Sequence, residues 1–384
     1  MRTAGVIVGV LVVLSVVVGV NVYVARRLLQ WSTLVFPGIN PTVFVVVYVV
    51  LAASFLVGYA PLPVPVRRTA AWIGGHWTGV FVYLLMFFVV AEVVVAAGRL
   101  VKIVPTPVPV GVRFGAGLVV VLSVAGLAAY GVFNAHRVTH VSYDVQLDEA
   151  LPSSMTIVLV SDLHLGSVGS ERNLARVVEE INRLEPDLVC LAGDIFNDDY
   201  RAIRDPDAVG RSLSSIRSTY GVYAALGNHD SGMPGATTFD EMVDLLERSD
   251  IRVLKDEYET IDDRIVLVGR LDWSPIGNTN GLARQDTASF MSTVDTDLPV
   301  VVMDHNPATI GQYGAETDLI LAGHTHRGQM FPANLITGAM YAVDYGYYRK
   351  DADSPQVVVT SGAGTWAIPM RIGSRSEVVS ITLH

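Results

Sequence analysis

Residues 156–164, TIVLVSDLH, decide how the second part of this 384-residue chain folds. The apolar run 156–160 predicts a buried strand, and Ser161, Asp162, Leu163 and His164 follow it directly. In an extended segment, residues i and i+2 point the same way, so Asp162 and His164 can present two donor atoms to one point. The stretch therefore predicts a strand with functional side chains at its carboxyl end.

Four further predicted strands end in the same way. G-D follows the strand at 188–191, G-N-H-D the strand at 222–226, D-H-N-P the strand at 300–303 and G-H-T-H the strand at 319–321. The carboxyl ends of strands in open α/β sheets line a ligand crevice, so we expect these residues to converge. The predicted site consists of Asp162, His164, Asp194, Asn228, His229, Asp230, His305, His324 and His326.

The donor set indicates two metal ions. A single tetrahedral ion takes about four ligands, and the strand ends offer more imidazole, carboxylate and amide donors than that. Such donors suit two divalent ions of the Mn, Fe or Zn kind. A thiolate site is excluded, because Cys190 is the only cysteine and lies in the apolar run 188–192, as a packing residue does.

The remaining periodicity predicts an α/β domain with a second, more strand-rich sheet. Further strands are predicted at 264–268, 356–360 and 378–383. One amphipathic helix is predicted at 171–184 behind an N-cap at Ser170, and another begins at Thr238, which has capping-box spacing with Glu241.

The ordered motifs resemble the calcineurin-like metallophosphoesterase family, and they occur in that family's order with no ligand missing. The runs 323–329, 347–349 and 361–372 resemble a membrane-associated branch that includes UDP-2,3-diacylglucosamine hydrolases. That branch usually has Gly where this chain has Arg327. The resemblance implies a four-layer αββα sandwich with a two-metal site at the strand ends.

The resemblance also implies a role for each site residue. Asp162, His164 and His326 would hold one metal ion; Asn228, His305 and His324 would hold the other; and Asp194 would bridge them. His229 would assist the leaving group, and we expect Asp230 to orient it. The family's second acidic residue after G-D is here Asn197, with Asp198 following, so the residue that supports the ligands stays open. Arg327 is a candidate phosphate contact, with a surface ion pair as the alternative.

The first 140 residues have a different composition. They hold nine Lys and Arg and one acidic residue, a net charge of +8, whereas residues 141–384 hold 18 basic and 36 acidic residues, a net charge of −18. This contrast excludes a single soluble domain, and the acidic second part excludes a nucleic-acid surface. Apolar runs at 4–24, 42–60, 75–97 and 115–134 each approach the ~20 residues that a membrane span needs.

The sequence therefore predicts an integral protein of the cell membrane, with a four-span transmembrane region at 1–140 and a metallophosphoesterase domain at 141–384. Four spans place both chain ends on the same side. Basic residues in the loops number four on that side and five on the other, so they do not decide the orientation. Glu92 lies within a predicted span, either as a functional site or as a protonated or snorkelling acid.

These observations predict a membrane-anchored phosphoesterase that hydrolyses a monoester or diester through a metal-bridging hydroxide. Tethering to a bilayer favours a lipid-linked or otherwise amphiphilic phosphoester. One alternative is a scaffold or sensor that kept the fold without the chemistry, although such derivatives are expected to lose ligands. In another alternative, the spans form a transport or lipid-binding module that the phosphoesterase regulates. Glu92, the only acidic residue within a predicted span, is the only residue that supports this alternative.

Overall fold

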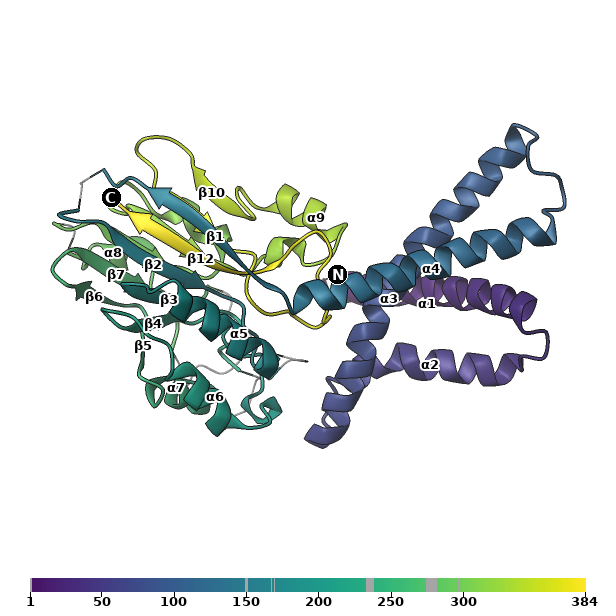
Figure 1. Ribbon diagram of the computed structural model, residues 1–384, viewed down its shortest axis with the longest axis horizontal. Coiled ribbons are helices and arrows are strands. Elements are labelled where there is room, and N and C mark those ends of the chain that lie inside the picture. Colours follow the sequence, from purple (N-terminus) through teal and green to yellow (C-terminus); the bar gives the residue numbers. More distant parts are fainter. Residues whose placement is uncertain are drawn as a thin grey trace. The chain divides into compact units, whose positions relative to one another are not determined.

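The computed structural model describes residues 2–148, 151–166, 168, 170–232, 238–273, 282–295 and 297–384, with side chains from residue 8 onward. The chain divides into two compact units, Met1–Tyr130 and Gly131–His384 (Figure 1). The division falls ten residues before the boundary predicted at 140, because the last turn of the fourth helix belongs with the second unit.

The first unit consists of apolar helices. They are α1 (Arg2–Val35), α2 (Pro41–Val57), α3 (Val64–Leu100) and α4 (Val110–Ala135), the last of which continues into the second unit. Within the described residues, three stretches are long and apolar enough to cross a membrane: Val8–Val35, Val64–Leu100 and Val110–Ala135. The second predicted span corresponds to α2, which is apolar but only 17 residues long.

Glu92 is paired within the first unit. Its carboxylate forms an ion pair with Arg27 of α1 and accepts a hydrogen bond of 2.8 Å from the hydroxyl of Tyr23. A carboxylate in an apolar environment is stabilised by such partners. Neither expectation for Glu92 foresaw an internal ion pair.

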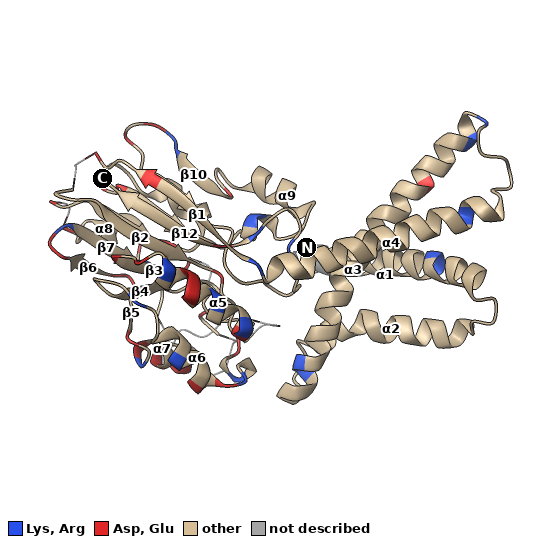
Figure 2. Cartoon of the chain, in the orientation of Figure 1, with Lys and Arg blue, Asp and Glu red and all other residues tan. Residues whose placement is uncertain are grey.

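Acidic residues otherwise concentrate in the second unit (Figure 2).

Two six-stranded sheets form the centre of the second unit. The first has the order β1 (Val138–Val145), β12 (Ser376–Leu383), β2 (Met155–Val160), β3 (Leu188–Ala192), β4 (Val222–Ala225) and β5 (Ile251–Val253). The second has the order β10 (Gly346–Arg349), β11 (Gln356–Val359), β9 (Leu319–Ala322), β8 (Val300–Met303), β7 (Ile265–Gly269) and β6 (Glu257–Ile261). Strands β2, β3 and β4 run parallel to one another, as do β7, β8 and β9.

Three apolar cores hold this unit together. One packs the first sheet against α5 (Ser170–Arg183), α6 (Pro206–Leu213) and α7 (Thr238–Glu247). A second lies between the sheets, where side chains of β2 and β3 meet those of β7, β8 and β9. The third covers the outer face of the second sheet and includes residues of α8 (Thr287–Met291). The unit is thus a mixed α/β sandwich.

The strands and helices predicted from periodicity are confirmed to within one or two residues at most ends, and so is the second sheet. The elements that were not predicted are the edge strands β1, β5, β6 and β10, the helices α6, α8 and α9 (Ala333–Met340), and the 3₁₀ turns η1 (Tyr200–Ala202), η2 (Pro307–Gln312) and η3 (His326–Gly328). The strands β5, β6 and β10 are three to five residues long, too short for a clear periodic signal. In β6 the alternation is also broken, because two exposed residues precede a half-buried one.

Candidate metal centre

The predicted site residues lie at the carboxyl ends of five strands. Asp162 and His164 follow β2, Asp194 follows β3, and the loop with Asn228 and His229 follows β4. The other sheet contributes His305 after β8, and His324 and His326 after β9. The strand ends of both sheets therefore supply the same centre.

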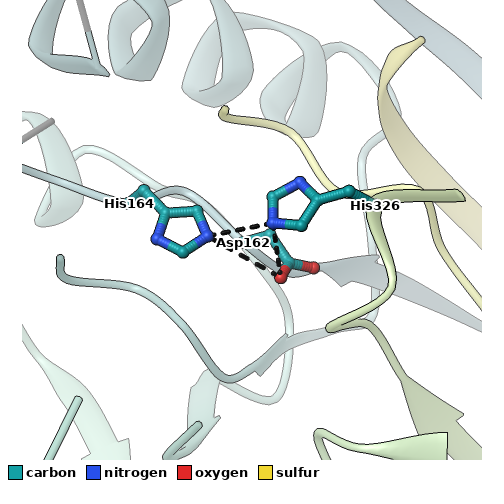
Figure 3. Close-up of side chains that lie close together, drawn as sticks. All are labelled: Asp162, His164 and His326. Carbon is teal, nitrogen blue, oxygen red and sulfur yellow. Dashed lines mark hydrogen bonds and ion pairs between the residues drawn. The ribbon is translucent and has the colours of Figure 1, made fainter. Parts of the chain in front are cut away.

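The first cluster consists of Asp162, His164 and His326 (Figure 3). The Nε2 atoms of the two histidines lie 3.0 Å apart, and His326 Nε2 lies 3.3 Å from Asp162 Oδ1. All three side chains are buried. Three donor atoms that face one another at this spacing in a buried position are arranged as ligands around one cation.

The second cluster consists of Asp194, His305 and His324. His305 Nε2 lies 3.1 Å from Asp194 Oδ2, and the rings of His305 and His324 are 5.1 Å apart. The same Asp194 oxygen lies 3.9 Å from His164 Nε2 of the first cluster. Asp194 therefore faces both clusters, as a bridging carboxylate would.

The backbone around these residues is unusual. Five of the predicted ligands have positive φ angles: Asp162 (56°), His164 (47°), Asp194 (50°), His324 (69°) and His326 (49°). Non-glycine residues adopt this region rarely and at an energetic cost, and such residues gather at functional sites. The surrounding fold holds the ligand loops in a conformation that the isolated sequence does not favour.

Two glycines allow the loops to approach the ligands. A Cβ atom at Gly227 would lie 2.3 Å from Asp194 Oδ1, and one at Gly323 would lie 2.5 Å from Asp162 Oδ2. Neither distance leaves room for a methyl group. The glycines of the G-N-H-D and G-H-T-H motifs are therefore required by close packing against a carboxylate.

His229 has a different partner from the one predicted. Its Nδ1 lies 2.8 Å from Asp198 Oδ1, whereas Asp230 accepts hydrogen bonds from the backbone N–H groups of Phe196 and Gly227. The expectation that Asp230 orients His229 is therefore wrong. Asp230 instead holds the loop after β4 against the loop after β3, and Asp198 is the acid that supports His229.

Two further contacts fix the ligand imidazoles. His305 Nδ1 donates to the carbonyl of Ala192 at 2.8 Å, which leaves Nε2 directed at Asp194. Arg371, which is fully buried, donates to His326 Nδ1 at 3.2 Å and to the carbonyls of Gly362 and Gly364. Arg371 was not predicted as a site residue, although it lies in the run 361–372 and is flanked there by apolar residues.

Burial controls the charge of the centre. It lowers the pKa of His164 to about 3 and that of His324 to about 4, and it also depresses the pKa of His326. Burial alone would lower the pKa of His305 as well, but the charge of Asp194 outweighs this effect and raises it. Three imidazoles are thus neutral at pH 7 and keep a lone pair for a cation.

His229 behaves in the opposite way. Burial would lower its pKa, but the hydrogen bond that His229 donates to Asp198 and the charges of Asp194 and Asp198 outweigh it and raise the pKa to about 9. The ring of His229 lies 5.1 Å from that of His164 and 5.8 Å from that of Trp366. A protonated imidazole therefore stands beside the ligand clusters without being a member of either.

Unsatisfied polar atoms test whether the centre fits metal ions. Within the described residues, His164 Nδ1, Asn228 Oδ1 and His305 Nε2 are buried and have no hydrogen-bond partner. A buried acceptor without a partner costs about 1–3 kcal/mol, so such atoms need a reason to persist. Coordination of a cation by Asn228 and His305 supplies that reason for two of them, and the residues present fit a two-metal centre.

Arg327 does not take part in a described ion pair. Its guanidinium group lies over the ring of Tyr345, 4.3 Å from the centroid, and its backbone N–H donates to Thr325. The alternative of a surface ion pair therefore finds no support within the described residues. The candidate role as a phosphate contact stays a prediction.

Comparison with known proteins gives a consistent result. Residues 155–328 match the family model of the calcineurin-like phosphoesterases. A transmembrane protein with a metallophosphoesterase domain from Danio rerio is 31% identical over 278 residues, which are 69% of this chain and 62% of that protein. An uncharacterised metallophosphoesterase from Campylobacter jejuni is 29% identical over 272 residues, 69% of this chain and 68% of its own.

A solved structure, a dimetal phosphatase from Danio rerio, aligns with 59% of this chain and 98% of its own at a TM-score of 0.37 and 15% identity. The chain spans about 62% of the length of the first curated relative. The matched region 155–328 contains every predicted ligand, from Asp162 to His326. Residues 155–328 thus belong to a calcineurin-like metallophosphoesterase domain.

Proposed function

We propose that this chain is a membrane-anchored, metal-dependent phosphoester hydrolase. The observation that carries the proposal is the pair of buried His and Asp clusters that share Asp194 at the strand ends. An enzyme needs such a set to be complete, whereas a scaffold or sensor does not. All seven predicted ligands are present.

We infer the following division of ligands. Asp162, His164 and His326 would hold one divalent ion, His305, His324 and Asn228 would hold the other, and Asp194 would lie between them. Two such ions, when bound, lower the pKa of water and stabilise negative charge on phosphoryl oxygens. Mn, Fe and Zn all suit these nitrogen and oxygen donors.

His229 is the proposed proton donor to the leaving group. A proton held on His229 at neutral pH can pass to the oxygen that departs from phosphorus, and Asp198 stabilises the charged imidazole and fixes the ring. Asp194 accepts the backbone N–H of His229 at 2.9 Å, so the position of the imidazole is tied to the shared carboxylate. No other described histidine combines this position with a raised pKa and no place in a cluster.

The finer architecture is also proposed. Helix α2 would be a fourth span, since its 17 residues contain no charged side chain and the polar cap of Asn40 stands at its start. At 1.5 Å per residue it would cross a thin or locally thinned bilayer core. The three apolar cores suit a four-layer αββα sandwich. Anchoring in a cell membrane favours an amphiphilic phosphoester substrate, and the diacylglucosamine branch is one candidate class.

The test uses the full chain purified in detergent. We expect two equivalents of bound metal, hydrolysis of an aryl phosphodiester with Mn²⁺, and loss of that activity on chelation. Substitution His229→Ala should reduce turnover by about 10²- to 10⁴-fold while metal content stays the same. Asp194→Asn is the matched variant that should lose metal. Two bound equivalents without turnover on any monoester or diester would overturn the enzymatic function.

A further inference from the structure

Helix α9 (Ala333–Met340) buries none of its residues. Leu335 is 62% exposed, Ile336 59% and Met340 71%, and Phe331 just before the helix is 41% exposed. At 100° per residue, Leu335, Ile336, Ala339 and Met340 share one face of about 140°. We call Phe331, Leu335, Ile336 and Met340 the α9 surface.

The opposite side of α9 is anchored beside the metal centre. Thr337 donates to Asp344 at 2.7 Å, and Thr325, between two predicted ligands, donates to the backbone carbonyl of Asp344 at 2.6 Å. A Cβ atom at Gly328 would lie 2.1 Å from the backbone nitrogen of Asn334, so the start of α9 packs directly on the turn that carries His326. The outward apolar face is therefore held in place and does not result from a loose segment.

The α9 surface is connected to the end of α4 through one loop. Phe331 donates its N–H to the carbonyl of Ile372 at 2.6 Å, and Arg371 donates its N–H to the carbonyl of Gly131 in the last turn of α4 at 2.9 Å. Asn134 donates to the carbonyls of Arg371 and Ser374. Because β1 begins three residues after α4 ends, this loop lies where the chain leaves an apolar span.

Charge distinguishes this region from the rest of the unit. Residues 141–384 hold 36 acidic side chains, yet 131–143, 319–343 and 355–376 hold none. The same segments carry exposed Arg137 and Arg375 and the exposed Trp366. Figure 2 shows no acidic residue on α9. The neighbouring carboxylate, that of Asp344, accepts from Thr337 on the opposite side of α9. Exposed apolar and aromatic side chains beside arginines are typical of surfaces that meet lipid headgroups.

We propose that the α9 surface docks onto the interface of the bilayer that α4 enters. Its apolar face would lie among the headgroups and upper acyl chains, and Arg137 and Arg375 would contact anionic headgroups. Together with the proposed function, this docking places the metal centre at the headgroup level, where a lipid-linked phosphoester presents its phosphate while its tail stays in the bilayer.

The experiment uses the full chain in vesicles of phosphatidylcholine and phosphatidylglycerol. The variants Leu335→Cys and Ile336→Cys are labelled with an environment-sensitive fluorophore, and lipids with a spin label on the upper acyl chain act as quencher. Cys190 is fully buried and leaves the background low. The control is Ser154→Cys, an exposed position just before β2, at the opposite end of the sheet from the site.

We expect a blue-shifted emission and several-fold stronger quenching at Leu335 and Ile336 than at Ser154. Equal quenching at all three positions would overturn the docking. A blue shift without quenching, together with crosslinking between copies, would assign the α9 surface to a second chain and also overturn it. None of these readouts involves hydrolysis, so a failure of docking and a failure of the proposed enzymatic function remain distinguishable.

A second arm compares substrates. The variant Leu335→Glu/Ile336→Glu should lose most hydrolysis of a lipid-linked phosphodiester in vesicles, while hydrolysis of a soluble aryl phosphodiester stays within about twofold of the parent chain. An equal loss on both substrates would mean that α9 supports the metal centre and does not deliver lipid.

Discussion

Nδ1 of His229 lies 2.8 Å from Oδ1 of Asp198, and this pair gives the site its one cationic imidazole outside the ligand clusters. Asp198 is four residues beyond the shared carboxylate Asp194, on the loop after β3. The acid that charges His229 thus comes from the neighbouring strand and not from its own loop.

The variant Asp198→Asn should move the alkaline limb of the pH–rate profile to lower pH. The pKa of His229 is raised to about 9, so the protonated acid is present below that pH and is lost above it. Removal of the charge of Asp198 should lower the pKa of His229, and so shift the midpoint of this limb to lower pH, by about one unit or more. The profile of hydrolysis against pH is the measurement, and Asp207→Asn, an exposed acid, is the control. An unmoved limb would assign it to another group.

The variant Asp230→Ala should destabilise the second unit and weaken metal binding. It leaves the N–H groups of Phe196 and Gly227 without their acceptor, which costs about 1–3 kcal/mol for each buried group. Thermal unfolding and metal content are the measurements, and Asp353→Ala, at an exposed position, should change neither. A stable, metal-loaded variant with reduced turnover would instead restore Asp230 to a role beside His229.

The variant Gly227→Ala should lose metal because its methyl group would meet Asp194 Oδ1 at 2.3 Å. The shared carboxylate would have to move, and both clusters depend on it. The matched control is Gly311→Ala, where a Cβ atom meets nothing within 4 Å. Metal content by elemental analysis separates the two variants. Equal metal content would contradict the prediction and show that the loop can move to accommodate the methyl group.

The variant Arg27→Met should destabilise the first unit more than Arg27→Met/Glu92→Gln. The single change leaves the carboxylate of Glu92 without its cation in an apolar environment, whereas the double change removes both charges. Thermal stability in detergent for the parent chain, both single variants and the double variant gives the coupling energy. A coupling near zero would show that lipid or water replaces Arg27 at no cost.

The sequence predicted the sandwich and its site well where pattern and chemistry coincide. The runs that became β3, β8 and β9 are fully buried, and the run that became β2 is buried except at Thr156. The ligands follow these strands directly, so the predicted ends of the strands also gave the positions of the ligands. Histidine and carboxylate at each end then indicated a metal centre.

The partner of His229 could not be predicted in the same way. Asp198 and Asp230 are both close to a ligand motif, and the choice between them depends on backbone turns after β3 and β4. Asp198 itself has a φ of 54°, a conformation that local propensity disfavours. The α9 surface was also missed, because the eight residues of this helix contain no long periodic run.

The positive φ angles of five ligands limit how this centre can be transferred to another protein. Grafting the seven ligand side chains onto another α/β sheet would not reproduce the centre, because their directions come from left-handed backbone turns. A designer would have to move the loops whole, with Gly227 and Gly323 in place. The centre can therefore be transferred only as complete loops, because the backbone conformation of these loops determines where the ligand side chains point.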